Sequence, residues 1–196
     1  MSEWRAALRG RGLTAALAAA LCPVVEVPPL AGQRGMPTDP ARECRDLEFR
    51  ILVPTSPARV IEDWLDPSTV DRFLGVSSSI EARRGGRYEI RFMRGDDADA
   101  RANSTAGARI LALERGRHLA FEWRVPPWAR EPARSAPATR VDLWAVPGDS
   151  HPAAGGRTIL HLRHSGFGTG EAWDEVRSFF QWNWFRILSR YEALPG

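Results

Sequence analysis

From residue 46 onward, apolar and polar positions alternate in short runs that are typical of half-buried β-strands. In the first run, LEFRILV (47–53), Phe49, Ile51 and Val53 share one face, while Glu48 and Arg50 share the other. Six later runs continue this pattern: VSSSIEA (76–82), RYEIRFM (87–93), AGARILALE (106–114), RHLAFEWRV (117–125), TRVDLWAV (139–146) and RTILHLRH (157–164). The pattern therefore predicts seven strands.

Two short helices and one long helix are predicted by apolar residues that recur every three or four positions. Between the first two strands, Ser56 with Pro57 and Asp66 with Pro67 each pair a helix-capping residue with proline at the first helical position. The long helix covers residues 171 to 194. Its apolar stripe consists of Trp173, Val176, Phe180, Trp184, Ile187, Tyr191 and Leu194.

The order of these elements predicts an α+β fold. Gly85 and Gly86 separate two strand patterns, which indicates a hairpin because glycine accepts a positive φ. Consecutive strands followed by a terminal helix are typical of an antiparallel sheet with helices on one face. We expect a curved six- to seven-stranded antiparallel sheet wrapped around the C-terminal helix, with two short helices after the first strand. This arrangement leaves a space for a ligand, bordered by the Pro-rich loop 126–138.

Composition favours a large apolar interior over a nucleic-acid-binding surface. The chain has eight Trp and eight Phe but only two Tyr, and 43% of its residues are hydrophobic. All 27 basic residues are arginine, but they are interspersed among 24 acidic residues and leave a net charge of +3. We therefore expect no nucleic-acid partner. Two cysteines, Cys22 and Cys44, are too few for a disulfide framework.

The first 35 residues form a tail that differs from the rest of the chain. A basic start, a short apolar run (13–25) and small residues with prolines describe a signal peptide. The alternatives are a disordered tail and upstream sequence included by a start codon assigned before Met36. The run is shorter than the ~20 apolar residues that a membrane span needs. We expect a cytoplasmic protein, with export as the alternative. The predicted organisation is a tail (1–35), a linker (36–45) and one domain (46–196).

The stretch LHLRHSGF (160–167) contains two histidines, His161 and His164, which strand alternation places on opposite faces. They cannot share a metal ion, and no third ligand stands at a usual spacing, so we predict no metal site. His164 follows two inward leucines, so it is either a hydrogen-bonded core histidine or a side chain that lines the cavity. Acid–base catalysis would require a polar partner, for which Tyr88 and Ser78 are the candidates.

Several longer motifs are specific when taken together: EFRILVPTSPARVIEDWLDPSTVDRFLG, RRGGRYEIRF, GARILALERGRHLAFEW, TRVDLWAV and TILHLRHSGF. With the Trp-bearing terminal helix, they resemble the activator of heat-shock-protein-90 ATPase homologue-like branch of the SRPBCC superfamily, which has a START-like, helix-grip fold. The resemblance covers residues 47 to 194 and implies a deep apolar cavity that binds a small hydrophobic ligand. His164 matches the histidine of the family's HSGF pattern, and Trp123 matches the tryptophan of its FxW strand. The family shares no universal catalytic residue, so none is carried over.

Three functions are compatible with these patterns. The first, which we favour, is non-catalytic binding of a small hydrophobic ligand without a cofactor. The second is a polyketide cyclase- or aromatase-like enzyme that uses His164 as its acid or base. The third is a chaperone-associated or other protein-interaction module, with a homodimer contact through Phe179, Trp182 and Phe185, which lie off the buried stripe of the last helix. The expected ligand-binding residues are Trp64, Tyr88, Phe121, Trp123, His164, Phe167, Trp173 and Trp184.

Overall fold

The computed structural model of the protein describes residues 45–95, 102–148 and 156–194. The predicted tail, both cysteines and nearly all of the predicted linker lie outside these residues. The expectations about export and about the linker therefore stay predictions. Among the helices that the structure describes, none is both long and apolar enough to cross a membrane.

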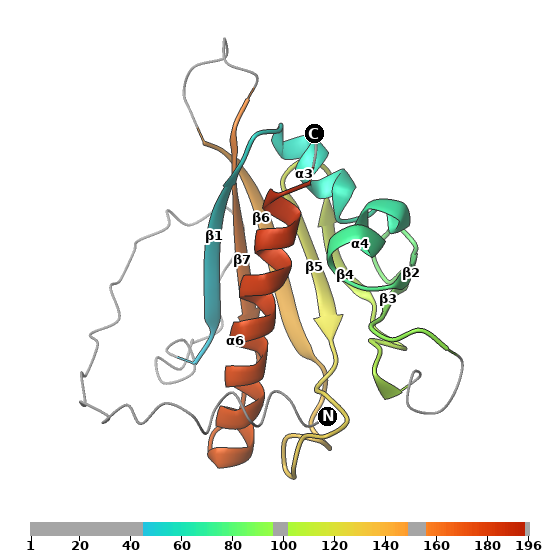
Figure 1. The fold of residues 1–196 in the computed structure, drawn as a ribbon, viewed down its shortest axis with the longest axis vertical. Coiled ribbons are helices and arrows are strands. Elements are labelled where there is room, and N and C mark those ends of the chain that lie inside the picture. The colour runs from blue at the N-terminus through green and yellow to red at the C-terminus, as the bar shows by residue number, and fades with distance from the viewer. Residues whose placement is uncertain (1–44, 96–101, 149–155, 195–196) are drawn as a thin grey trace, which may run out of the picture. The chain divides into compact units, whose positions relative to one another are not determined.

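A five-stranded antiparallel sheet lies at the centre of the fold (Figure 1). Its strands, in spatial order, are β1 (Leu47–Val53), β7 (Thr158–Ser165), β6 (Thr139–Pro147), β5 (His118–Trp123) and β4 (Ile110–Glu114). Along β7, side chains alternate between buried and half-buried positions, as the sequence pattern predicts. His164 is buried on the inner face and His161 lies on the outer face, so the predicted opposition of the two histidines is confirmed.

Strands β2 (Ser77–Ile80) and β3 (Tyr88–Arg91) form a separate two-stranded antiparallel sheet. The predicted hairpin between them is confirmed, and Gly85 has a φ of 75°. Gly86 does not have a positive φ. It is required for a different reason, because a Cβ at this position would lie 2.3 Å from the Glu81 carbonyl oxygen.

All seven predicted strands are present, but they are divided into sheets of five and two strands. The division occurs at Thr105, in the segment that precedes β4. The Thr105 side chain takes the place of part of the backbone pairing between this segment and β3. Its Oγ1 donates to the Tyr88 carbonyl oxygen (3.0 Å) and accepts from the Ile90 N–H (2.8 Å). Isolated bridges on either side of Thr105 join the two sheets.

The two short helices begin where the sequence predicts their caps. They are α3 (Pro57–Asp63) and α4 (Pro67–Phe73). The Ser56 hydroxyl accepts a bond from the backbone N–H three residues later (3.3 Å). At α4, the Asp66 carboxylate accepts bonds from the hydroxyls of Ser68 and Thr69 and from the Thr69 N–H. These hydrogen bonds lower the pKa of Asp66 to about 2.

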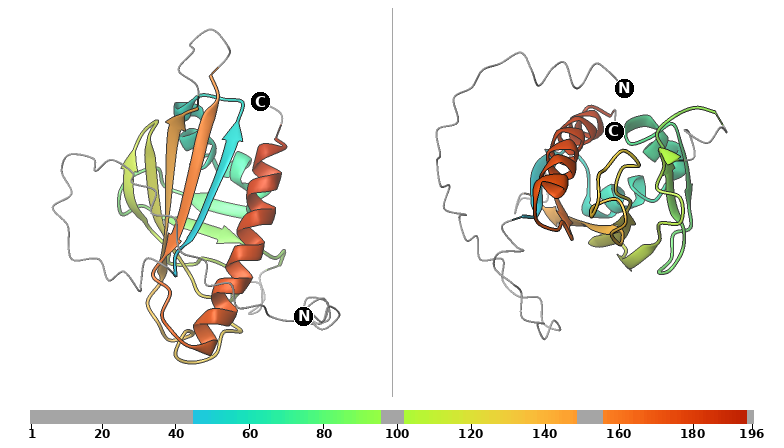
Figure 2. Two further views of the ribbon diagram at one scale, coloured as in Figure 1. Left: turned by 90° about the vertical axis from the view of Figure 1, so that its left-hand side faces the viewer. Right: turned by 90° about the horizontal axis from the view of Figure 1, so that it is seen from below.

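The long helix α6 (Glu171–Glu192) lies on the inner side of the curved sheet, as the two views in Figure 2 show. Leu188 is buried, whereas the predicted stripe residue Ile187 is only half-buried. Near the end of α6, the Tyr191 hydroxyl donates to Asp63 Oδ2 (3.1 Å) and so connects this helix to α3. The buried side chains of α6 are Trp173, Val176, Phe180, Trp184, Leu188 and Tyr191. The predicted α+β architecture, with an antiparallel sheet against a long C-terminal helix, is confirmed.

A directed series of hydrogen bonds joins the middle of α6 to the sheet. Trp184 Nε1–H donates to His164 Nδ1 (2.9 Å), so this nitrogen carries no hydrogen. The neutral ring therefore carries its hydrogen on Nε2 and donates to the Thr139 hydroxyl (2.7 Å), which donates in turn to the Trp123 carbonyl oxygen (2.9 Å). Burial lowers the pKa of His164 to about 3. The ring is consequently neutral at physiological pH.

This burial predicts that acid destabilises the protein through His164. Unfolded histidine has a pKa of about 6.5, so below that pH the unfolded state binds a proton that the folded ring does not bind until about pH 3. The stability of the wild type relative to a non-titrating His164→Gln variant should fall by about 1.4 kcal/mol per pH unit between about pH 6 and pH 4. Urea unfolding of both proteins across this range measures the effect, and a difference independent of pH would contradict a neutral buried ring.

Candidate functional site: a cavity beside the last helix

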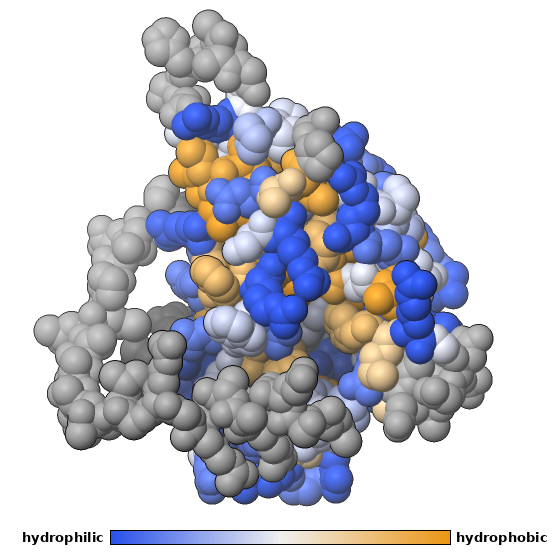
Figure 3. All heavy atoms as spheres, in the orientation of Figure 1, coloured by the Kyte–Doolittle hydropathy of each residue, from blue (hydrophilic) through white to orange (hydrophobic). Residues whose placement is uncertain are grey.

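A cavity of about 320 Å³ lies beside α6. Its walls come from segments that are far apart in the sequence: residues 74–76 after α4, residues 123–128 at the end of β5, and one side of α6. Phe92 and residues 102–104 complete the lining. In Figure 3, apolar residues show between hydrophilic ones on the face of the molecule that carries α6.

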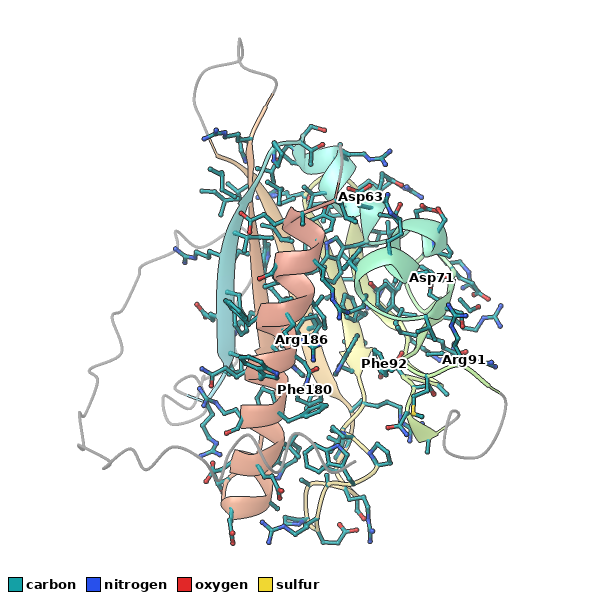
Figure 4. The ribbon with its side chains drawn as sticks, in the orientation of Figure 1. Asp63, Asp71, Arg91, Phe92, Phe180 and Arg186 are labelled. Atoms are coloured by element: carbon teal, nitrogen blue, oxygen red, sulfur yellow. The ribbon has the colours of Figure 1, made fainter. Side chains whose placement is uncertain are left out.

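Aromatic side chains form much of the cavity wall. The rings of Trp123 and Trp184 have centroids 5.0 Å apart, and the Phe92 ring lies 5.8 Å from that of Trp123. Trp128, from the Pro-rich loop, packs edge-on against Phe179 at 5.0 Å. Figure 4 shows Phe92 on the segment that follows β3, across from α6. The loop that the sequence places beside the ligand space therefore contributes to the lining.

The structure brings all eight predicted ligand-binding side chains into one connected cluster, but only Trp123 and Trp184 line the cavity. The other six are buried outside the lining. Contact between those six and a ligand stays a prediction. The ring-centroid separations that connect the cluster are Tyr88–Phe121 4.0 Å, Phe121–Trp123 5.8 Å, Trp123–Trp184 5.0 Å, Trp64–Trp184 6.5 Å, His164–Trp184 5.9 Å, His164–Phe167 4.6 Å and Phe167–Trp173 6.2 Å.

His164 is not among the lining residues, and both of its ring nitrogens are hydrogen-bonded within the core. The two partners predicted for it lie elsewhere. The Tyr88 hydroxyl donates to the Trp64 carbonyl oxygen (3.0 Å), and the Ser78 hydroxyl donates to a carbonyl oxygen of α4 (3.2 Å). Burial also raises the pKa of Tyr88. The geometry therefore makes His164 a positioning residue for Trp184 and does not present it as an acid or base to the cavity.

The polar part of the wall is a feature that sequence reasoning missed. Three arginines line the cavity, Arg124, Arg186 and Arg190, together with the amides Asn103 and Asn183. No Asp or Glu is among the described residues that line it. The spacing of the two helical arginines was visible in the sequence, but arginine is so frequent in this chain that the spacing carried no signal.

The outer face of the sheet carries a second group of titratable side chains. His118 Nε2 lies 2.9 Å from Asp142 Oδ1, and Arg140 contacts both carboxylate oxygens of Asp142 at 2.6 and 2.7 Å. Although burial opposes it, these bonds hold the pKa of Asp142 below its usual range. Trp144 packs between His118 and His161, with ring centroids 5.1 and 5.2 Å away. Across the ranges that the structure describes, no three His, Cys, Asp or Glu side chains gather as metal ligands.

Solved structures with this fold come from diverse sources. Protein MLL2253 from Mesorhizobium loti matches with a TM-score of 0.56 and 16% identity, covering 75% of this chain and 93% of that chain. PFC0360w, an HSP90 activator from Plasmodium falciparum, matches with a TM-score of 0.55 and 14% identity, covering 76% and 94%. DynU16, a protein in the dynemicin biosynthetic locus, matches with a TM-score of 0.50 and 19% identity, covering 76% of this chain and 46% of that chain. Identities this low show the fold alone.

The family is shown by a sequence profile and not by an individual relative. Comparison with curated protein sequences returns no significant match. The profile described as activator of Hsp90 ATPase homolog 1-like protein matches residues 54–194, which include every described helix and every strand except β1. The chain therefore belongs to the activator of Hsp90 ATPase homolog 1-like family, within the SRPBCC superfamily that its motifs resemble.

Proposed function

We propose that this chain binds a small hydrophobic molecule in the cavity beside α6. One observation carries the proposal: a cavity of about 320 Å³ is lined by Trp123, Trp184 and other aromatic side chains, with its polar groups supplied by three arginines, two asparagines and one serine. Small-molecule sites usually have volumes of about 300–1,000 Å³ and mostly apolar walls with a few polar groups that orient the ligand. The volume lies near the lower end of this range, which favours a compact molecule with up to three rings or a short chain.

Membership of the family supports the same proposal, since its fold is compatible with ligand binding. The polyketide cyclase-like alternative finds a structural parallel in a protein of the dynemicin biosynthetic locus. It receives no support from His164, however, because neither ring nitrogen is available to a substrate and the ring lies outside the lining. We therefore propose binding without acid–base catalysis at this residue.

Filling the cavity should weaken binding of a neutral hydrophobic probe. Phenylnaphthylamine, whose fluorescence rises in apolar surroundings, should bind the wild type saturably. A Val125→Phe variant adds a ring to the cavity wall and should weaken binding by about tenfold or more, about 1.4 kcal/mol, because the added ring occupies space that the probe needs. A fluorescence titration measures both dissociation constants.

The matched control is Val146→Phe, which adds the same group at a residue that is 49% exposed and does not line the cavity. This variant should bind the probe as the wild type does. Equal binding by wild type and Val125→Phe would place the probe elsewhere and contradict the proposal, as would the absence of saturable binding to the wild type.

A second candidate function is self-association through the exposed flank of α6. Trp182 and Phe185 are 62% and 60% exposed, and their rings stack with centroids 6.3 Å apart. On the helix they lie on the flank away from the cavity. Phe179, which the sequence groups with them, is half-buried and lines the cavity instead. We propose that the stacked pair meets the same pair of a second copy, since a two-fold contact brings identical patches together.

Replacing this pair should therefore weaken a homodimer. A Trp182→Ser, Phe185→Ser double variant should sediment as a monomer at concentrations where the wild type dimerises, because two large aromatic rings lose their burial. The control is Leu52→Ser with Val146→Ser, which removes exposed apolar side chains from the strands. Analytical ultracentrifugation over a concentration series decides, and a wild type that stays monomeric throughout would overturn the dimer.

A further inference from the structure

The cavity combines apolar rings with cationic side chains whose charges have no partner in its wall. Arg186 and Arg190 lie one helical turn apart on α6, and both are exposed. Neither forms an ion pair with a residue in the described part of the chain. Arg124, which follows β5, donates one bond from Nη1 to the Ala106 carbonyl oxygen (2.8 Å) and has further N–H groups beyond it.

Neighbouring carboxylates are already engaged or lie outside the lining. Early in α6, Glu171 and Glu175 pair with Arg130. Asp63 and Asp71, labelled in Figure 4, belong to α3 and α4, and neither lines the cavity. Asp63 accepts bonds from Arg59 (2.7 Å) and from the Tyr191 hydroxyl (3.1 Å). The arginines of the cavity are therefore not neutralised by the acids of the adjoining helices.

Like charges four residues apart on a helix repel one another, so this pair of arginines is a small cost to the free protein. An anion between them would remove that cost, and the planar guanidinium group matches carboxylate and phosphate oxygens. The cavity wall is also apolar where it is buried and cationic where it meets the solvent. Trp123 and Trp184 are buried in its wall, whereas Arg186 and Arg190 lie at the solvent.

We propose that the ligand of this cavity is a hydrophobic molecule with an anionic head, such as a carboxylate or a phosphate. Its apolar part packs against Trp123 and Trp184, and Arg186 and Arg190 bind its head, with Arg124 as an additional donor. This inference rests on the proposed function and names the ligand class. It requires no catalytic step.

Two probes with the same aromatic frame test the inference. Anilinonaphthalene sulfonate carries an anionic group, and phenylnaphthylamine does not. The sulfonate should bind the wild type about tenfold more tightly than the neutral probe, because charge-assisted hydrogen bonds add to the apolar contact. An Arg186→Gln, Arg190→Gln double variant should lose that advantage, so that it binds the two probes with similar affinity. Raising the salt concentration should weaken binding of the sulfonate alone.

The control is an Arg50→Gln, Arg84→Gln double variant, which removes the same charge from exposed arginines outside the cavity. It should bind both probes as the wild type does. The inference would be overturned if the sulfonate still bound the cavity variant more tightly than the neutral probe does, or if it lost this tighter binding in the control. The proposed function would stand in either case, provided that the neutral probe binds the wild type. Failure of both probes to bind would instead overturn the proposed function itself.

Competition identifies the head group. Octanoate and octyl phosphate share an eight-carbon chain, and both should displace the sulfonate probe. Stronger competition by octanoate would indicate a carboxylate head group, and stronger competition by octyl phosphate would indicate a phosphate. Octanol is the neutral control, and displacement by octanol at the same concentrations would contradict a role for the anion.

Discussion

The position of α6 depends on the hydrogen bonds that run from Trp184 through His164 and Thr139 to the Trp123 carbonyl oxygen. Each donor in this series has one acceptor, and only one tautomer of the neutral imidazole satisfies both of its neighbours. Each such bond contributes only about 0.5–1.5 kcal/mol net, but leaving a buried partner unpaired costs about 1–3 kcal/mol. The series therefore selects one orientation for the Trp184 indole, and that indole forms part of the cavity wall.

The sequence predicts most of the fold because the relevant forces are local. Alternation identifies all seven strands, and Ser56 and Asp66 mark both short helices, since a cap and a proline act within one turn. The division into two sheets was beyond such reasoning. It depends on Thr105 bonding to Tyr88 and Ile90, and no short-range pattern reports which backbone groups a distant hydroxyl will meet.

The candidate site could be predicted only in part, for a related reason. Alternation shows that Tyr88, Phe121 and Trp123 point inward, but it cannot show whether an inward side chain meets another side chain or a void. The rings of Tyr88 and Phe121 stack on each other at 4.0 Å, while Trp123 borders the cavity. The sequence pattern does not identify Arg186 as a site residue, because its role depends on which acidic side chains lie near it in space. Sequence separation does not reveal those spatial neighbours.

Much of the cavity wall comes from connections and not from the paired strands, namely residues 74–76, 102–104 and 124–128. Connections tolerate substitution and changes of length far better than strands do, because no ladder register depends on them. Recognition thus depends partly on segments outside the paired strands, whereas Trp123 and Trp184 belong both to the cavity wall and to the hydrogen-bonded interior. Changes in these three connections and along one flank of α6 can therefore alter which ligand the cavity holds without disturbing the pairing of the strands.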